Sequence, residues 1–200
     1  QQQEKFPRAS TRGDANSLRT RIEGQLARMG DEQAIARLAD RARNATSDGC
    51  PRAQDDERVD ALNAVAQMDA ELALPILKKT LARRELCTQQ LRRTAVWLVA
   101  SRRVPDAASI LLNVAKTDPD KEVREQAVDW MSNVPTQETT TMLIELAKKG
   151  DDLDLRKRAV YALSRSKSPR AVTTLKEIIL DANADGDLRA DALNWYISGP

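Results

Sequence analysis

Five arginines recur along the chain at a nearly constant interval, and this period constrains the fold more than any other feature. The intervals are 34, 32, 32 and 33 residues. Three positions after each arginine stands an alanine, which is always followed by leucine or valine. A fixed period of this length is typical of stacked structural repeats. The arginines are Arg58, Arg92, Arg124, Arg156 and Arg189, and the alanines are Ala61, Ala95, Ala127, Ala159 and Ala192.

The composition indicates that the repeats are helical. Aromatic residues make up only 3% of the chain, with a single phenylalanine, whereas helix-forming alanine, leucine, arginine and glutamine are abundant. Prolines and glycines lie between stretches with helical spacing rather than within them. We therefore expect an all-α protein, an α-solenoid in which helical hairpins stack into a right-handed α–α superhelix.

The spacing of apolar residues divides the chain into four parts. Residues 1–16 predict a polar N-terminal arm, residues 17–44 a capping helical hairpin, and residues 45–54 a loop. Residues 55–200 predict an array of about four and a half repeats, so we expect a continuation beyond Pro200. In the cap, Ser17 is the expected N-cap, and one helix face is expected to bury Leu18, Ile22, Leu26 and Met29.

Each repeat is expected to contain two helices. The predicted first helices lie near 55–68, 88–102, 120–133, 153–165 and 186–197. The predicted second helices lie near 70–84, 105–117, 136–149 and 169–182, and we expect them to line the concave surface.

The periodic segments resemble HEAT-like repeats of the type first described for phycobilisome lyases. The resemblance covers roughly residues 53–197 and is clearest over 118–131 and 151–163, whereas Glu57 replaces the usual leucine or valine. It implies a ladder of pairs between Arg92, Arg124, Arg156 and Arg189 and acids such as Asp120, Asp154 and Asp187. Residues 56–103 also look like exported bacterial HEAT-repeat proteins, through Ala61-Leu62-Asn63-Ala64 and Leu74-Pro75-Ile76-Leu77.

The chain lacks the residues on which most catalytic sites depend. It has no histidine, which removes the commonest general base and the His-based iron site of HEAT-repeat hydroxylases. Its carboxylates follow helix starts, where they are expected to act as caps. Asp151, Asp152 and Asp154 could suggest calcium, but their spacing is not that of an EF-hand. We expect no catalytic, cofactor or metal site.

The two cysteines are predicted to form a disulfide bond. Cys50 and Cys87 lie in successive loops between hairpins, which fall on one edge of a solenoid. Two buried free thiols are the alternative. The chain starts with three glutamines, as a mature exported protein can, so we expect a periplasmic or extracellular location, with a cytoplasmic one as the alternative.

The candidate interaction surface combines rings and lysines. Its residues are Trp97, Trp130, Tyr161, Trp195, Lys78 and Lys79. The rings could instead pack between neighbouring helices. The net charge of +2 gives no general basic field, so nucleic acid is an improbable partner and a protein is the expected one. No apolar run approaches the roughly 20 residues of a membrane span, so any membrane contact would be through a partner.

These observations favour a non-catalytic interaction or scaffolding module, an exported accessory subunit that braces a larger complex. The first alternative is a lyase-like or regulatory factor for another enzyme, which would need a deep groove with convergent polar groups. The second is a nucleic-acid-binding array, whose binding would weaken steeply with salt.

Overall fold

The computed structural model describes residues 12–43, 57–65, 67–68, 70–102, 104–166 and 168–198. Within these ranges the chain forms eleven α-helices and one short 3-10 turn, and no strand. The first two helices are α1 (Arg12–Arg28) and α2 (Glu32–Arg43), and the 3-10 turn is η2 (Leu86–Thr88). The others are α3 (Glu57–Val65), α4 (Ala70–Leu81), α5 (Gln89–Ser101), α6 (Ala107–Thr117), α7 (Lys121–Met131), α8 (Gln137–Lys149), α9 (Leu153–Ser164), α10 (Pro169–Leu180) and α11 (Gly186–Ile197).

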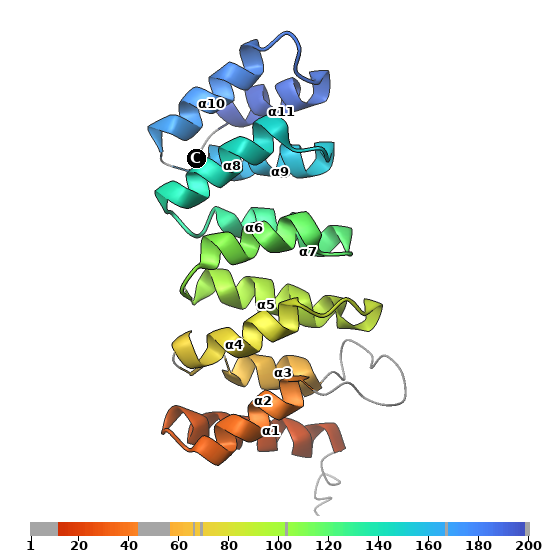
Figure 1. Ribbon diagram of the computed structural model, residues 1–200, viewed down its shortest axis with the longest axis vertical. Coiled ribbons are helices and arrows are strands. Elements are labelled where there is room, and N and C mark those ends of the chain that lie inside the picture. Colours follow the sequence, from red (N-terminus) through yellow and green to blue (C-terminus); the bar gives the residue numbers. More distant parts are fainter. Residues whose placement is uncertain are drawn as a thin grey trace, which may run out of the picture.

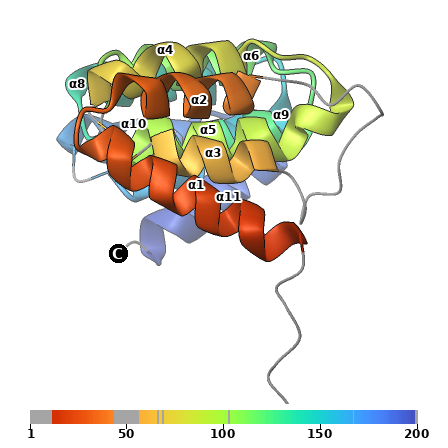
Figure 2. The ribbon, with the colours of Figure 1, turned by 90° about the horizontal axis from the view of Figure 1, so that it is seen from below.

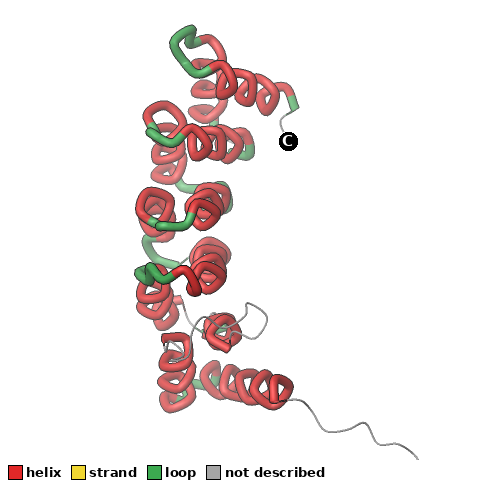
Figure 3. The backbone as a smooth tube through the Cα atoms, turned by 90° about the vertical axis from the view of Figure 1, so that its right-hand side faces the viewer, coloured by secondary structure: helices red, strands yellow, loops and turns green. Residues whose placement is uncertain are grey.

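The helices stack in sequence order along the long axis of the molecule (Figure 1). They form two layers, which appear as two columns in Figure 3. The first-helix layer contains α1, α3, α5, α7, α9 and α11, and each of these helices contacts the next. The second-helix layer contains α2, α4, α6, α8 and α10. The predicted all-α solenoid is therefore confirmed.

The array bends toward the first-helix layer. Figure 2 shows α1 and α11, at the two ends, displaced to the same side of α3 and α5. Contacts between neighbours are also more extensive in the first-helix layer than in the second. Because the outer layer of a bend is spread apart, α4, α6 and α8 lie on the convex side. The prediction that second helices line the concave surface was wrong.

Short side chains allow the layers to approach closely. The five repeat alanines are fully buried, and so are the aliphatic residues that follow the first four, Leu62, Val96, Val128 and Val160. In α11 the equivalent Leu193 is 45% exposed. Aspartates begin several first helices: Asp120, Asp152 and Asp185 accept hydrogen bonds from backbone amides of α7, α9 and α11. These three carboxylates act as caps, as predicted, whereas Asp106 at the start of α6 accepts no capping hydrogen bond from that helix.

The N-terminal hairpin differs from its prediction. Helix α1 begins at Arg12 rather than after Ser17. Leu18, Ile22 and Met29 are exposed, so the apolar face predicted to be buried instead points outward, and only Leu26 packs against the core.

A buried carboxylate holds this hairpin together instead. Glu23 Oε2 lies 2.7 Å from Arg41 Nη2, and Glu23 Oε1 lies 3.1 Å from Arg19 Nε and 3.5 Å from Arg37 Nε. Gly24 faces Ala64 of α3 so closely that a Cβ atom on the glycine would stand 3.2 Å from the Ala64 Cβ. Small residues and an ionic cluster thus occupy the packed face of α1, which displaces the larger apolar residues to the outside.

Candidate interaction surfaces

The periodic arginines bind backbone carbonyls near the junctions between successive hairpins. Arg156 Nε donates to the carbonyl of Ala147 (3.0 Å), and Arg189 Nε donates to that of Ile179 (3.1 Å). Arg124 Nη1 reaches the carbonyls of Asp118 (3.0 Å) and Pro119 (3.3 Å). Carbonyls at the end of a helix lack partners within that helix. The arginines therefore satisfy acceptors at or just beyond the end of the preceding second helix.

Arg58 belongs to the same column but reaches the following loop, where its Nη2 donates to the Cys87 carbonyl at 3.3 Å.

The predicted ladder is confirmed only in part. Arg92 pairs with Asp118, and Arg124 Nη2 lies 3.9 Å from Asp152 Oδ2 of the next repeat, but Asp120, Asp154 and Asp187 do not pair with the periodic arginines. Asp120 accepts from the Val123 amide and from Gln89 Nε2 (both 3.0 Å), while Asp154 and Asp187 pair with Lys121 and Lys157. The other ion pairs between repeats, which we call rungs, take their cations mainly from lysines, Arg93 and Arg158. Because caps and rungs engage these acids, Arg156 and Arg189 bind carbonyls instead.

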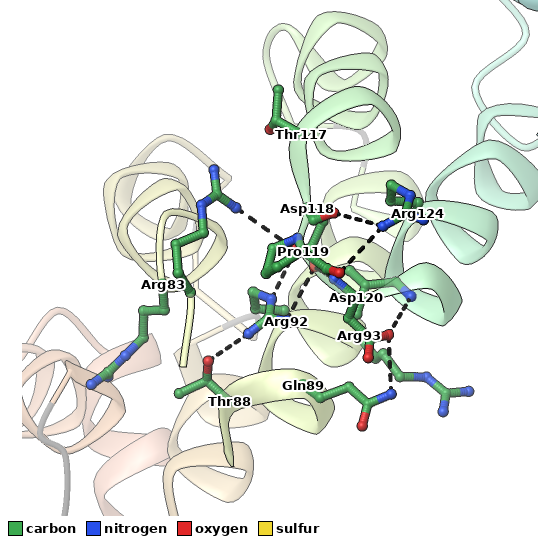
Figure 4. Close-up of polar contacts among 12 residues, drawn as sticks. Arg83, Thr88, Gln89, Arg92, Arg93, Thr117, Asp118, Pro119, Asp120 and Arg124 are labelled. Atoms are coloured by element: carbon green, nitrogen blue, oxygen red, sulfur yellow. Dashed lines mark hydrogen bonds and ion pairs between the residues drawn. The ribbon is translucent and has the colours of Figure 1, made fainter. Parts of the chain in front are cut away.

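Arg92 differs from the other periodic arginines because a buried carboxylate faces it. Its Nε and Nη2 donate to the two carboxylate oxygens of Asp118 at 2.8 and 3.1 Å. Its Nη1 donates to Thr88 Oγ1 (2.6 Å) and to the Glu85 carbonyl (3.0 Å), as Figure 4 shows in part. The Arg92 side chain is 1% exposed and that of Asp118 is fully buried. Arg92 therefore joins the loops before and after its own hairpin.

The sequence does contain a feature that distinguishes Arg92 from the other periodic arginines. Two positions before the N-cap aspartates Asp120, Asp152 and Asp185 stand Asp118, Gly150 and Asn183. Only the first of these can form an ion pair. Repeat position alone treated all five arginines as equivalent.

One carboxylate on the first-helix surface is poorly satisfied. Asp129 Oδ2 lies 3.1 Å from Arg158 Nη1, but the buried Asp129 Oδ1 has no hydrogen-bond partner within the described part of the chain. Burial raises the pKa of this carboxyl, while Arg158 opposes the shift and Glu125 adds to it. By contrast, the hydrogen bond from Lys121 lowers the pKa of the exposed Asp154.

These opposite shifts predict opposite effects of pH on two variants. Between the ordinary value of 3.8 and the raised value, folded Asp129 keeps a proton that the unfolded chain has lost, so stability falls as pH rises. We expect Asp129→Asn to gain stability relative to the wild type as pH rises from about 3 to about 6. Urea midpoints measured across this range test the expectation.

Asp154→Asn is the matched control, with the opposite sign. The lowered pKa of Asp154 gives a contribution that is fully present above 3.8 and is lost as pH falls through the folded value. The Asn variant should therefore lose stability relative to the wild type as pH rises through that window. Parallel curves for the two variants would contradict at least one of the two assignments.

The predicted rings all lie on first helices but are not equivalent. Trp97, on α5, is 40% exposed, whereas Trp130 and Trp195 pack partly against the core. Tyr161 and Trp195 meet edge to face, with ring centroids 4.8 Å apart. Arg165 lies over the Tyr161 ring at 5.9 Å. Packing between neighbouring helices therefore explains Tyr161 and Trp195, and leaves Trp97 as the most exposed ring of this set.

The predicted lysines lie in the other layer. Lys78 and Lys79 are exposed near the end of α4, and Lys78 Nζ lies 4.0 Å from Asp106 Oδ2. A cleft of about 400 Å³ runs between α4 and α6 beside Lys78. A larger groove, of about 760 Å³, lies between α6 and α8 and includes residues of α7, α9 and the α8–α9 loop. The lysines and the rings therefore do not form one surface.

Cys87 lies half-buried in η2 as a free thiol. Its predicted partner Cys50 lies outside the described residues, so the disulfide bond stays a prediction.

Over the described ranges, no three His, Cys, Asp or Glu side chains are grouped to hold a metal ion. In the same ranges no helix is both long and apolar enough to cross a membrane.

The stacked hairpins, the buried alanine column and the rungs between repeats define an α-solenoid. A family model described as HEAT repeats matches residues 84–153 and 109–194. These matches together span more than half of the chain, and the protein belongs to the HEAT-repeat family. No curated protein matches the chain. HEAT repeats commonly mediate protein–protein interaction or scaffolding, and such solenoids are typically non-catalytic.

Proposed function

We propose that this protein is a non-catalytic scaffolding module that binds a partner protein through its first-helix layer. The exposure of Trp97 carries the proposal. Trp97 lies in the middle of the stack, on the inner side of the bend, and keeps 40% of its surface exposed. Tryptophan is strongly enriched among residues that dominate binding energy at interfaces. The concave side of a solenoid also offers one continuous surface to a partner.

The surroundings of Trp97 support a protein rather than a polyanion as the partner. Arg93, one turn earlier on α5, already pairs with Glu122 at 3.1 Å, and further along the same layer Arg158 of α9 pairs with Glu125 and Asp129 of α7. Cations that are engaged by acids leave little net positive field for phosphates. A ring flanked by satisfied charges is typical of an interface with a hydrophobic centre and a polar rim.

Affinity capture with matched variants tests this function. The full chain is immobilised, incubated with an extract of its source, and the retained proteins are quantified by mass spectrometry. Trp97→Ala should deplete the specific partner by more than about tenfold, the loss expected for a binding hot spot. Leu86→Ala is the control, because Leu86 is 84% exposed but lies in η2, outside the first-helix layer.

Equal retention by Trp97→Ala and the wild type would refute a role for this layer. Capture that disappears after nuclease treatment and falls steeply with salt would favour the nucleic-acid alternative.

We further propose that the repeats are of the phycobilisome-lyase HEAT-like type and that the protein is exported, as an accessory subunit that braces a larger complex at a membrane surface. The position of Cys87 supports an oxidising location. Arg58 binds the Cys87 carbonyl and lies near the start of α3, eight residues after Cys50. An extended chain spans up to about 3.3–3.6 Å per residue, so the two cysteines lie within reach.

This location predicts a Cys50–Cys87 disulfide bond in protein purified from its source without reductant. Mass spectrometry of the alkylated, unfolded chain should then find no free thiol, and reduction should release two. Two free thiols before reduction would contradict the bond and weaken the proposal of export.

A further inference from the structure

The groove between α6 and α8 marks the place where the second-helix layer is open. Between α8 and α10, Lys148 Nζ binds Glu177 Oε2 at 2.5 Å. One repeat earlier the same positions are Lys116 and Glu145, 32 residues before each. Both of these line the groove, and neither has an ion-pair partner among the described residues. The ion pair that joins α8 to α10 therefore has no counterpart between α6 and α8.

The floor of this groove is apolar and its rim is charged. The floor includes Leu112 of α6, Met142 and Leu146 of α8, and Leu155 of α9. Lys116 of α6 and Arg124 of α7 make one side basic. The other side is net acidic, because its Glu145, Asp151 and Asp152 outnumber Lys149, and Asp152 lies 3.9 Å from Arg124. Met142 and Leu112 are only partly buried, which leaves apolar surface available to a ligand. An apolar strip between two neighbouring helices, with charges of opposite sign on its two sides, matches the way in which an amphipathic helix binds in a groove.

We propose that this groove binds an amphipathic α-helix of a partner protein. The helix presents an aliphatic ridge to Leu112, Met142 and Leu146, an acidic flank to Lys116 and a basic flank to Glu145. Its charges replace the rung that Lys148 and Glu177 form one repeat later. The site lies on the convex layer, opposite Trp97, so a scaffold would hold two ligands on its two faces. This inference does not depend on binding at the first-helix layer.

The test uses the full chain and three synthetic helical peptides of about 18 residues, or five turns. The first has leucines in one ridge, glutamates on the flank that faces Lys116 and lysines on the other. The second has the two charged flanks exchanged. The third has the composition of the first with the leucines spread around the helix. The readouts are fluorescence anisotropy for affinity and the ¹³C-methyl resonances of the four methionines for location.

The expected result is saturable binding of the first peptide with a shift of the Met142 methyl resonance alone. Met29 is exposed on α1 and Met131 is buried in α7, so their resonances should stay in place. The double variant Lys116→Glu/Glu145→Lys should bind the first peptide about tenfold more weakly than the wild type does, and the second peptide more tightly by a similar factor. Because both side chains lie on the rim, circular dichroism should match the wild type.

The proposal is overturned if the Met142 resonance does not move, if several methionines shift together, or if the third peptide binds as well as the first. A Met142 shift that depends on the concentration of the chain alone would assign the groove to a second copy, which also overturns it. Loss of partner capture by Trp97→Ala with unchanged peptide binding would separate this site from the proposed function.

Discussion

Replacement of Arg92 by alanine is expected to lower the free energy of unfolding by about 3–5 kcal/mol. The substitution removes two guanidinium hydrogen bonds from the fully buried Asp118 carboxylate, which keeps, among the described residues, only the Asp120 amide at 2.9 Å and Arg84 at 3.9 Å. It also removes the donor to Thr88 and to the Glu85 carbonyl, so the loops on both sides of the α5–α6 hairpin lose a common partner.

Urea denaturation followed by circular dichroism and tryptophan fluorescence measures this loss. Arg156→Ala is the matched control, since Arg156 has the same place in its repeat but is only partly buried and donates to a single carbonyl. Its loss should be near 1 kcal/mol, the net value of an ordinary hydrogen bond.

The double variant Arg92→Met/Asp118→Leu should recover most of the stability, because an apolar pair leaves no buried charge without a partner. If Arg92→Ala and Arg156→Ala cost the same, the buried pair has no special role. If the double variant is as unstable as Arg92→Ala, lost packing rather than the unpaired carboxylate determines the effect.

Leu62→Ala is expected to cost about 2–5 kcal/mol, whereas Leu193→Ala should cost less than about 1 kcal/mol. The two leucines occupy the same repeat position and lose the same atoms. Leu62 is fully buried between successive hairpins, while Leu193 on α11 is 45% exposed. The comparison therefore isolates the contribution of stacking from that of side-chain chemistry.

Chemical denaturation of both variants, with Leu72→Ala as a second exposed control, measures the difference. Solenoids can unfold in stages, so the fluorescence of Trp97, Trp130 and Trp195 should be compared with the circular dichroism signal. Equal losses at Leu62 and Leu193 would mean that stacking does not bury the column as the structure indicates.

The repeat period and the apolar spacing were sufficient to predict the helices of the array. Most helix boundaries lie within a few residues of their predicted positions, because turn residues and acidic caps mark the ends. The prediction of the buried face of the N-terminal hairpin was wrong for a physical reason. The apolar row of α1 was assigned to the core from its spacing alone, but Gly24, Ala27 and the Glu23 cluster provide the packed face. Spacing predicts that a stripe exists, not which stripe is buried.

The partners of the arginines could not be predicted from the repeat pattern. Each helix end exposes carbonyls that need donors, and each helix start exposes amides that need acceptors. Caps and rungs engage Asp120, Asp154 and Asp187, so Arg156 and Arg189 bind carbonyls, whereas Arg92 and Arg124 also reach a carboxylate. Likewise, the layer on the inside of the bend depends on small differences in helix spacing summed over the stack. The missing rung at Lys116 and Glu145 is a further result of that geometry, since the same residue types meet one repeat later.

The bonds that join successive hairpins recur at equivalent positions. Asp152 caps α9, while Arg156 of α9 binds the carbonyl of Ala147 in the preceding α8, and Arg189 of α11 binds that of Ile179 in α10 in the same way. Deletion or duplication of a whole repeat would therefore rejoin equivalent donors and acceptors, which suits growth of the array by whole units. The Arg92 seam is different, because its guanidinium joins the loop before its hairpin to a fully buried carboxylate after it, whereas Arg124 reaches only the partly exposed Asp152, at 3.9 Å. Lineages that lengthen or shorten this array should therefore do so on either side of residues 85–118 and keep that unit whole.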